Sequence, residues 1–382
     1  MLSKWPMHDA EQIDAVTRVL QSGRTNYWSG EEGRAFESEF ARYCDVPYAV
    51  AVANGTVALE LALRALEIGD GDEVIVPASS FVATAAAVVT VGAKPVFADI
   101  NATTHTLDAA TIEARISART RAVIAVHLNG CPCPMDEIMQ LAQRNGLMVI
   151  EDCAQAHGAR WNNRPVGSFG AAAAFSFCQD KILSTGGEGG LLLCAERNTW
   201  HRAVSYKDHG KKPGHQHAHG GSYRYVHESI GSNWRMTEMQ AAIGRVQLRR
   251  LDKWVSQRSR IAAALVRQLG DSILQPPQVP AAALHAWYRL PFMLPPDALV
   301  QGWSRDRVLA RLREAGVPCL AGSCPELYLE HSLERFAPRQ RCRNAANYGA
   351  NGLCLTMNPC RSAAEVSWVA EQVRLVLNQV VR

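Results

Sequence analysis

A single lysine, Lys181, stands between a short apolar run, Ala172–Phe177, and a turn rich in glycine, Gly186–Gly190. A lysine amine forms a Schiff base with an aldehyde only when it is held beside that aldehyde and partly desolvated, so that neutral amine is present. The glycines let the backbone come close to a flat ring. Lys181 is therefore the candidate covalent nucleophile, although a solvated lysine beside an ordinary turn gives the same local pattern.

An acidic pair follows a second apolar run upstream, where Met148–Asp152 ends in Glu151 and Asp152. Ligands of open α/β sheets bind at the carboxyl ends of strands. Asp152 at such an end would lie against the ring nitrogen of a pyridine cofactor and raise the pKa of that nitrogen by stabilising its charged form. A protonated ring is the better electron sink. Glu151 and Glu188 have a structural alternative as caps of backbone groups, and His157 has one as a satisfied buried histidine.

Short β-rich runs alternate with helical patterns along the first half of the chain. This alternation predicts an α/β fold with a largely parallel sheet covered by helices on both faces. The expected strands are Ala49–Ala53, Glu73–Pro77, Pro95–Ile100, Ala122–His127, Met148–Asp152, Ala172–Phe177 and Gly190–Cys194. A helix predicted over Thr56–Leu66 begins after the capping sequence Asn54–Thr56. Its first backbone N–H groups are a natural cradle for phosphate.

Helical periodicity over a long span, from about Met236 to Leu269, predicts the helix that leaves a large domain. The proline-rich stretch Gln275–Pro280 breaks this pattern, and the remainder indicates a smaller α+β domain that closes with the amphipathic helix Ala363–Leu377. We therefore predict a large cofactor-binding domain over residues 1–250 and a small C-terminal domain over residues 251–382.

Composition describes an ordinary globular protein, with 382 residues of which 47% are apolar and 20% charged. The net charge of +4 is small and the basic residues are scattered, so nucleic acid is a poor candidate partner. No apolar run approaches the length of a membrane-spanning helix, and the N-terminus has no secretory signal. We expect a cytoplasmic protein without a membrane partner.

Eleven cysteines without a secretory signal predict free thiols. Cys131-Pro132-Cys133 lacks the two-residue spacer of common metal knuckles and has no matching downstream pair, so no metal site is predicted. The histidine-rich segment 214–221 is glycine-rich as well, which favours a flexible loop near the active site over a metal site.

These segments, in this order, resemble the DegT/DnrJ/StrS-type family of pyridoxal-phosphate sugar aminotransferases. Further stretches that carry the resemblance are Ala53–Leu59, Gly71–Pro77, Val126–Gly130 and Gly231–Ala242. Together they span roughly residues 50 to 245. The resemblance implies a fold-type I transferase with a seven-stranded, mostly parallel sheet in the large domain and a smaller C-terminal α+β domain. It also implies an N-terminal segment that packs near the small domain.

The resemblance implies a role for each matching residue. Lys181 would bind pyridoxal 5'-phosphate covalently and shuttle a proton, Asp152 would pair with the ring nitrogen, and Gln155 would hydrogen-bond the phenolic oxygen of the ring. Phe81 falls where the family stacks an aromatic side chain on the pyridine face, with a core residue as the alternative.

The cofactor phosphate needs several donors, and Gly55, Thr56 and Ser176 match the phosphate-binding positions of the family. Asn233 lies in the segment that, in the family, reaches the phosphate of the neighbouring subunit. The resemblance therefore implies a homodimer with shared active sites.

The reaction that the resemblance implies is transfer of an amino group from glutamate or glutamine to a keto-sugar nucleotide, in the biosynthesis of amino sugars for polysaccharides or secondary metabolites. The loop from Tyr206 to Tyr225 is basic enough to meet a nucleotide diphosphate, and a solvated loop is the alternative. Cys178-Gln179-Asp180 departs from the commoner family pattern, in which a histidine follows Phe-Ser-Phe. This departure leaves open a carbocyclic keto acceptor of the cyclitol or aminohydroxybenzoate type.

Three other functions compete with a transaminase. A cofactor-dependent dehydratase of the same fold would have another base in place of Lys181. A dinucleotide-binding dehydrogenase would need a Gly-x-Gly-x-x-Gly turn, which Ala53–Thr56 does not supply. A regulatory protein that binds pyridoxal phosphate without catalysis is disfavoured because Lys181, Asp152 and Gln155 are all present.

Overall fold

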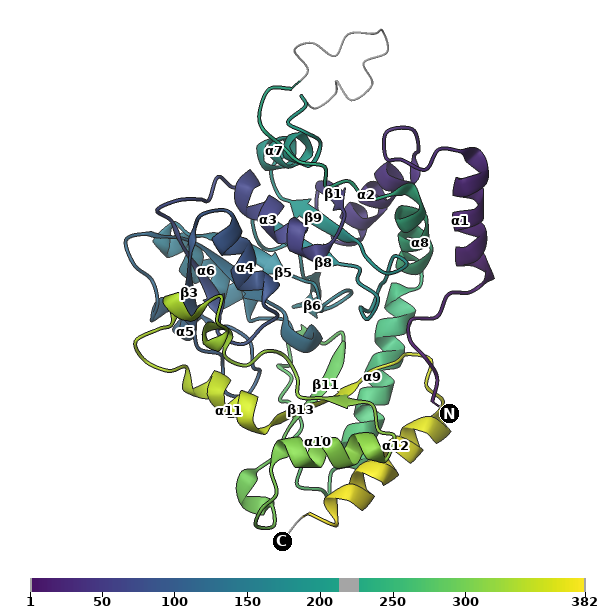
Figure 1. The fold of residues 1–382 in the computed structure, drawn as a ribbon, viewed down its shortest axis with the longest axis vertical. Coiled ribbons are helices and arrows are strands. Elements are labelled where there is room, and N and C mark those ends of the chain that lie inside the picture. Colours follow the sequence, from purple (N-terminus) through teal and green to yellow (C-terminus); the bar gives the residue numbers. More distant parts are fainter. Residues whose placement is uncertain (1, 213–226, 381–382) are drawn as a thin grey trace.

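The computed structural model describes residues 2–212 and 227–380, and its centre is a seven-stranded sheet (Figure 1). The strand order is β1-β9-β8-β5-β4-β2-β3, and β9 alone runs antiparallel to its neighbours. The strands are β1 (Tyr48–Val52), β2 (Glu73–Pro77), β3 (Lys94–Ala98), β4 (Thr120–Val126), β5 (Met148–Asp152), β8 (Ala172–Ser176) and β9 (Gly190–Cys194). The predicted α/β class and the mostly parallel sheet are therefore confirmed.

Helices cover both faces of this sheet. As a result, its strands are buried on both sides, as in other mostly parallel sheets. One face packs against α3 (Gly55–Ala65), α4 (Ala83–Thr90) and α7 (Arg197–Lys207). The other face packs against α2 (Glu32–Tyr43), α5 (Ala109–Glu113), α6 (Met135–Asn145) and α8 (Glu238–Leu248). α1 (Ala10–Ser22) lies outside this layer and contacts α8.

A second, three-stranded sheet, in the order β11-β13-β12, lies in the C-terminal part of the chain, at the bottom of Figure 1. Its strands are β11 (Arg289–Met293), β12 (Cys319–Leu320) and β13 (Gly352–Thr356). It shares a hydrophobic core with α9 (Leu251–Gln268), α10 (Arg305–Glu314) and α12 (Ala363–Leu377). The last of these matches the predicted closing helix.

Two stretches connect this C-terminal part with the rest of the molecule. Residues between Leu327 and Tyr348 pack into the core of the seven-stranded sheet. Leu2 packs against the C-terminal core, and the Ser3 hydroxyl donates a hydrogen bond of 2.7 Å to Glu365 of α12. The division at residue 250 stays a prediction.

The smaller elements complete the chain. They are β6 (Arg160–Trp161), β7 (Arg164–Pro165), β10 (Ala283–Leu284), α11 (Arg343–Asn351) and the short 3-10 helices η1 (Leu128–Gly130), η2 (Pro296–Ala298), η3 (Leu327–Leu329) and η4 (Glu334–Phe336).

The single long helix expected from Met236 to Leu269 is wrong, because the structure has two helices, α8 and α9, separated at Arg249 and Arg250. No proline or glycine marks this break in the sequence. Arg250 is held by ion pairs to Asp9 and Glu11 beside α1, so tertiary contacts accompany a break that periodicity does not reveal.

All eleven cysteines are free thiols, as the sequence predicts, and eight of them are buried. Among the helices of the described ranges, none is both long and apolar enough to cross a membrane.

Three buried histidines predict an acid-sensitive fold. Burial lowers the pKa of His105 to about 4 and the pKa values of His157 and His285 to about 3. In the unfolded chain each histidine has a pKa of about 6.5. Below that pH the unfolded state therefore binds more protons than the folded state, and the free energy of unfolding falls as the pH drops. We expect the free energy of unfolding, from urea titrations, to be about 3 to 4 kcal/mol lower at about pH 5.5 than at about pH 7.5.

His157→Phe is the matched variant for this prediction, because the ring of His157 packs on Phe175 and Phe177. It removes one of the three titrating groups, so the pH dependence of its stability should be shallower by about one third. An unchanged pH dependence would show that these histidines do not cause the acid sensitivity.

Candidate active site

A cavity of about 680 Å³ opens beside Val126, Asp152 and Ser176, which end the strands β4, β5 and β8. Register explains part of this grouping, since Val126 pairs with Asp152 across β4 and β5. Seven of the eight predicted site residues line the cavity: Gly55, Thr56, Phe81, Asp152, Gln155, Ser176 and Lys181. The eighth, Asn233, is exposed and does not line it.

Lys181 lies in the turn after β8, and its side chain is 15% exposed. Its Nζ atom lies 3.4 Å from the hydroxyl of Tyr288 and 3.8 Å from Oδ1 of Asp180. The backbone carbonyl of Lys181 accepts a hydrogen bond of 2.9 Å from the indole of Trp5. The amine is therefore held from two sides while it faces the cavity, as a reacting amine needs to be.

Tyr288 and Arg289 are cavity residues that the sequence reasoning missed. Tyr288 donates a hydrogen bond to Asp180, and the guanidinium of Arg289 lies 3.3 Å from the Tyr288 hydroxyl. Burial raises the pKa of Tyr288, so this hydroxyl stays protonated at neutral pH. The two residues lie at the start of β11, more than one hundred positions from Lys181, and no local pattern ties them to the lysine.

Asp152 is a buried carboxylate without an ion-pair partner among the described residues. Its Oδ2 accepts a hydrogen bond of 2.9 Å from Thr84, and its Oδ1 accepts one of 3.2 Å from the backbone N–H of Ala154. Burial raises the pKa of Asp152, and these bonds, with Lys181 nearby, act in the opposite direction. A buried carboxylate that lines a cavity in this state is suited to a cationic ligand group.

The start of α3 forms the opposite wall. Asn54 is the N-cap, and its side chain accepts a hydrogen bond of 3.0 Å from the N–H of Val57, as predicted. Gly55 approaches Ser176 so closely that an added Cβ would lie 2.5 Å from the Ser176 Cβ. The first turn of a helix lacks intrahelical partners for its N–H groups, so this corner is an anion site of the kind a phosphate takes.

Phe81 and Gln155 occupy the remaining predicted positions. Phe81 is 62% exposed although it is large and apolar, so the alternative of a core residue is wrong. Gln155 is buried, and its Oε1 accepts a hydrogen bond of 2.8 Å from the N–H of Asn129. This bond leaves the amide nitrogen of Gln155 as the group that can donate to a ligand.

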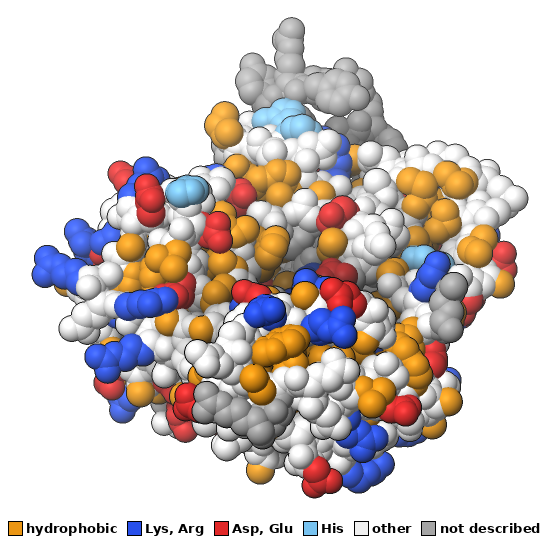
Figure 2. Space-filling model, turned by 60° about the horizontal axis from the view of Figure 1, so that its bottom comes forward, with side chains coloured by type: hydrophobic (Ala, Val, Ile, Leu, Met, Phe, Trp, Pro, Cys, Tyr) orange, Lys and Arg blue, Asp and Glu red, His pale blue; other side chains and the backbone are white. Residues whose placement is uncertain are grey.

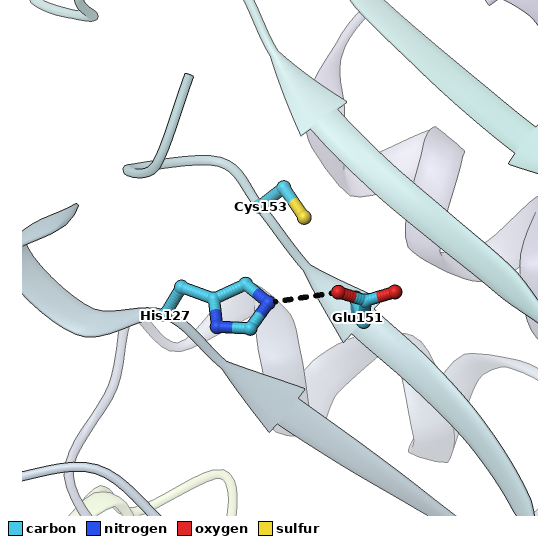
Figure 3. A group of neighbouring side chains, drawn as sticks. All are labelled: His127, Glu151 and Cys153. Atoms are coloured by element: carbon cyan, nitrogen blue, oxygen red, sulfur yellow. Dashed lines mark hydrogen bonds and ion pairs between the residues drawn. The ribbon is translucent and has the colours of Figure 1, made fainter. Parts of the chain in front are cut away.

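Glu151 lies outside the cavity and forms a buried cluster with His127 and Cys153 (Figure 3). The Nδ1 atom of His127 accepts from the N–H of Cys133, so its Nε2 carries the proton and donates to Glu151 over 3.1 Å. Glu151 also accepts three backbone N–H bonds of 2.7 to 2.8 Å, from Gly167, Phe169 and Gly170. The cluster has the residue types of a metal site, but these bonds already engage both ring nitrogens of His127 and both carboxylate oxygens of Glu151.

Glu151→Gln should therefore destabilise the fold without touching the cavity. An amide has one acceptor oxygen where the carboxylate has two, so buried N–H groups lose partners. We expect a loss of about 3 kcal/mol in the free energy of unfolding, measured by chemical denaturation. The exposed Glu188→Gln is the control and should change stability by less than about 0.5 kcal/mol. Equal stability of the two variants would contradict the structural role.

Glu188 and His157 lie differently with respect to the cavity. Glu188 is exposed and lines the cavity, whereas His157 is fully buried and does not. In the basic loop from Tyr206 to Tyr225, Lys207 is fully buried and paired with Glu37 at 3.1 Å, so this lysine of the loop is not free to meet a nucleotide diphosphate. Residues 213–226, including Arg224 and the histidine-rich segment, lie outside the described residues.

A model of the DegT/DnrJ/EryC1/StrS aminotransferase family matches residues 6–374. The chain belongs to this family. A UDP-N-acetyl-3-dehydro-alpha-D-glucosamine 3-aminotransferase from Acidithiobacillus ferrooxidans is 36% identical over 375 residues, which cover 98% of this chain and 95% of the relative.

Two solved structures have the same fold over nearly the whole chain. An aminotransferase from Psychrobacter cryohalolentis has a TM-score of 0.94 and 41% identity, with 100% of both chains covered. A 3-amino-5-hydroxybenzoic acid synthase has a TM-score of 0.91 and 30% identity, with 99% of both chains covered. The predicted fold type and the predicted enzyme class, a pyridoxal-phosphate-dependent aminotransferase, are confirmed.

Proposed function

We propose that this enzyme moves an amino group from glutamate or glutamine to a keto-sugar carried on a nucleotide, with pyridoxal 5'-phosphate held in the cavity around Lys181. The observation that carries the proposal is the convergence of an amine, an unpaired carboxylate and a helix start on one cavity of about 680 Å³. The relative from Acidithiobacillus ferrooxidans, whose name describes amination of a UDP-linked keto-sugar, supports the acceptor class.

The donor set of the cavity fits the cofactor. Asp152 offers a carboxylate without an ion-pair partner among the described residues, which matches a protonated ring nitrogen. The start of α3, with Gly55, Thr56 and Ser176 beside it, offers the donors that a phosphate dianion needs. Phe81 presents an apolar face to the cavity, and Lys181 presents the amine. Bound there, pyridoxal phosphate would supply an aldehyde for the lysine and an electron sink for the amino transfer.

The side chains around the cavity have separate proposed roles in the reaction. The Lys181 amine is the base that moves a proton on the substrate carbon, and Tyr288 fixes its position through the 3.4 Å contact to Nζ. Asp180 holds the Tyr288 hydroxyl, and Arg289 supports the same hydroxyl from the other side. Asp152 would hold the ring nitrogen of the cofactor, and Gln155 would donate to the ring through its free amide.

Stopped-flow and end-point spectroscopy test this function. The protein with pyridoxal phosphate should show a visible absorption band that bleaches on addition of L-glutamate or L-glutamine. A subsequent addition of a keto-sugar nucleotide should restore the band and yield an amino-sugar nucleotide. A protein that binds the cofactor but never regains the band with any keto-sugar nucleotide would refute the acceptor class.

A second acceptor class is a carbocyclic ketone. The 3-amino-5-hydroxybenzoic acid synthase, at 30% identity over 99% of both chains, favours it, as does the run Cys178-Gln179-Asp180 before the lysine. Asp180 and Cys178 both line the cavity. Recovery of the absorption band with a keto-cyclitol or an aminohydroxybenzoate precursor, and with no nucleotide sugar, would select this class.

We also propose a homodimer in which Asn233 completes the phosphate site of the partner subunit. Asn233 is exposed and lies outside the cavity of its own chain, as a residue acting in trans would. Its backbone is fixed by a bridge to Asp208, which pairs with Arg235. Analytical ultracentrifugation should give a dimer, and Asn233→Ala should weaken cofactor affinity about tenfold. A monomer with normal cofactor affinity would contradict the proposal.

A further inference from the structure

A second cavity, of about 300 Å³, lies beside the catalytic cavity and shares Asp180, Tyr288 and Arg289 with it. Its other walls come from three parts of the chain. These are the N-terminal segment, the second sheet's strand β12 with the residue before it, and the end of β13 with the turn that follows: Leu2, Ser3, Trp5, Pro318, Leu320, Thr356, Met357, Asn358 and Arg361. Figure 2 looks onto the lower part of the molecule, where charged side chains of both signs gather near the centre of the view.

Arg361 lines this second cavity and lacks partners for most of its guanidinium. The residue is 9% exposed, and its Nε and Nη1 atoms have no hydrogen-bond partner among the described residues. Its Nη2 makes one long hydrogen bond, of 3.4 Å, to the hydroxyl of Thr356. A buried cation without paired acceptors is costly, so a site of this kind is completed by an anion.

The carboxylate closest in sequence to Arg361 is already engaged. Both oxygens of Glu365 accept hydrogen bonds, one from the backbone and hydroxyl of Ser3 and the other from the N–H of Ser362. Glu365 thus ties the N-terminal segment to α12 and caps that helix. It makes no ion pair with Arg361 within the described part of the chain.

Arg258 adds a second buried positive charge behind the same wall. It is fully buried, its Nη1 donates to the carbonyls of Trp287 and Met357, and its Nε and Nη2 have no partner among the described residues. Its guanidinium lies 5.2 Å from the ring of Trp5, a residue of the cavity wall. The one acidic side chain in the described wall, Asp180, is engaged by Tyr288 and Arg289.

We propose that the second cavity binds a small organic carboxylate, with Arg361 as its charged ligand. The side chains of Leu2, Trp5 and Leu320 supply apolar wall for a short carbon chain. A volume of about 300 Å³ is at the lower end for ligand pockets and is too small for a nucleotide. The shared wall places this subsite next to Lys181 without including it, so the proposal goes beyond the cofactor and acceptor sites.

Calorimetric titration of the cofactor-loaded enzyme with glutarate, which has neither an amino nor a keto group to react, tests the proposal. Wild type should bind glutarate saturably at millimolar concentration. Arg361→Gln should bind at least about tenfold more weakly, because a charge-assisted hydrogen bond is lost, and Arg361→Lys should keep part of the affinity. The exposed Arg374→Gln, on the same C-terminal helix that follows Arg361, is the matched control and should bind as wild type does.

Butyrate and inorganic phosphate serve as competitors and separate the sources of the anion. If glutarate binds more strongly than butyrate, the ligand class is the dicarboxylates, to which the proposed amino donor glutamate belongs. If butyrate binds more strongly, the ligand is a monocarboxylate effector. Either result supports a carboxylate subsite. Phosphate that displaces glutarate equally well would overturn it. Absence of saturable binding to wild type, or unchanged affinity in a folded Arg361→Gln, would also overturn it.

The Lys181→Ala variant keeps this test separate from the proposed function. Lys181 does not line the second cavity, so glutarate should bind this variant as it binds wild type. Loss of the cofactor band with retained glutarate binding would show that the two sites are independent. Loss of glutarate binding in Lys181→Ala would overturn a separate subsite.

Discussion

Lys181→Ala should lower the rate of amino transfer by about a thousandfold or more. In its proposed role Lys181 attaches the cofactor covalently and moves the proton, so the substitution would remove both functions, and no other lysine lines the described cavity. The fold should remain intact, because the amine makes one long hydrogen bond and one distant ion pair. The loss is measured as the rate at which the aminated product forms from a keto acceptor in the presence of an amino donor.

Two further lysine variants distinguish the reactivity of the Lys181 amine from its positive charge. Lys181→Arg keeps a positive charge beside Tyr288 but cannot attach the cofactor, so it should be as inactive as the alanine variant. The exposed Lys253→Ala should retain the wild-type rate. An active Lys181→Arg enzyme would contradict the role of the amine.

Asp152→Asn should lower the turnover number by about a hundredfold and the free energy of unfolding by about 1 kcal/mol, because the amide cannot accept the second bond, from the N–H of Ala154. Asparagine keeps the size of the side chain and its oxygen can accept the 2.9 Å bond from Thr84, but it removes the charge that, in the proposed role of Asp152, would keep the ring nitrogen of the cofactor protonated. The electron sink weakens as a result. Turnover measured at saturating donor, together with urea denaturation, tests both halves of the prediction.

The exposed Asp271→Asn is the control for this substitution, because it also removes one carboxylate charge. Its turnover should equal that of wild type. If Asp152→Asn lost activity only in proportion to a loss of folded protein, Asp152 would be a structural residue rather than a cofactor ligand.

The large sheet and most of the candidate site followed from local sequence patterns. The parallel strands β4, β5 and β8 end in residues that line the cavity, because parallel strands bring their carboxyl ends to one edge. Asp152, Ser176 and the α3 start at Gly55 all follow this rule. The left-handed glycine Gly186, with φ of 84°, likewise marks the turn after Lys181.

Contacts between distant segments did not follow from local patterns. Tyr288, just before β11 of the second sheet, contacts Lys181, and Arg289 at the start of β11 contacts Tyr288. Trp5 reaches the backbone carbonyl of Lys181 from the N-terminal segment. The break between α8 and α9 also depends on such contacts, through Arg250 and α1. No local pattern marks Arg361 in the sequence, and its burial beside the second cavity emerges only from the fold.

The most direct test of the account is mass spectrometry of the cofactor-loaded protein after reduction with borohydride, which makes a lysine-bound cofactor permanent. Peptide mapping should find one pyridoxal phosphate adduct, on Lys181, in wild type, and none in Lys181→Ala. An adduct on another lysine, or a wild-type protein without any adduct, would contradict the assignment of Lys181 as the cofactor-binding residue.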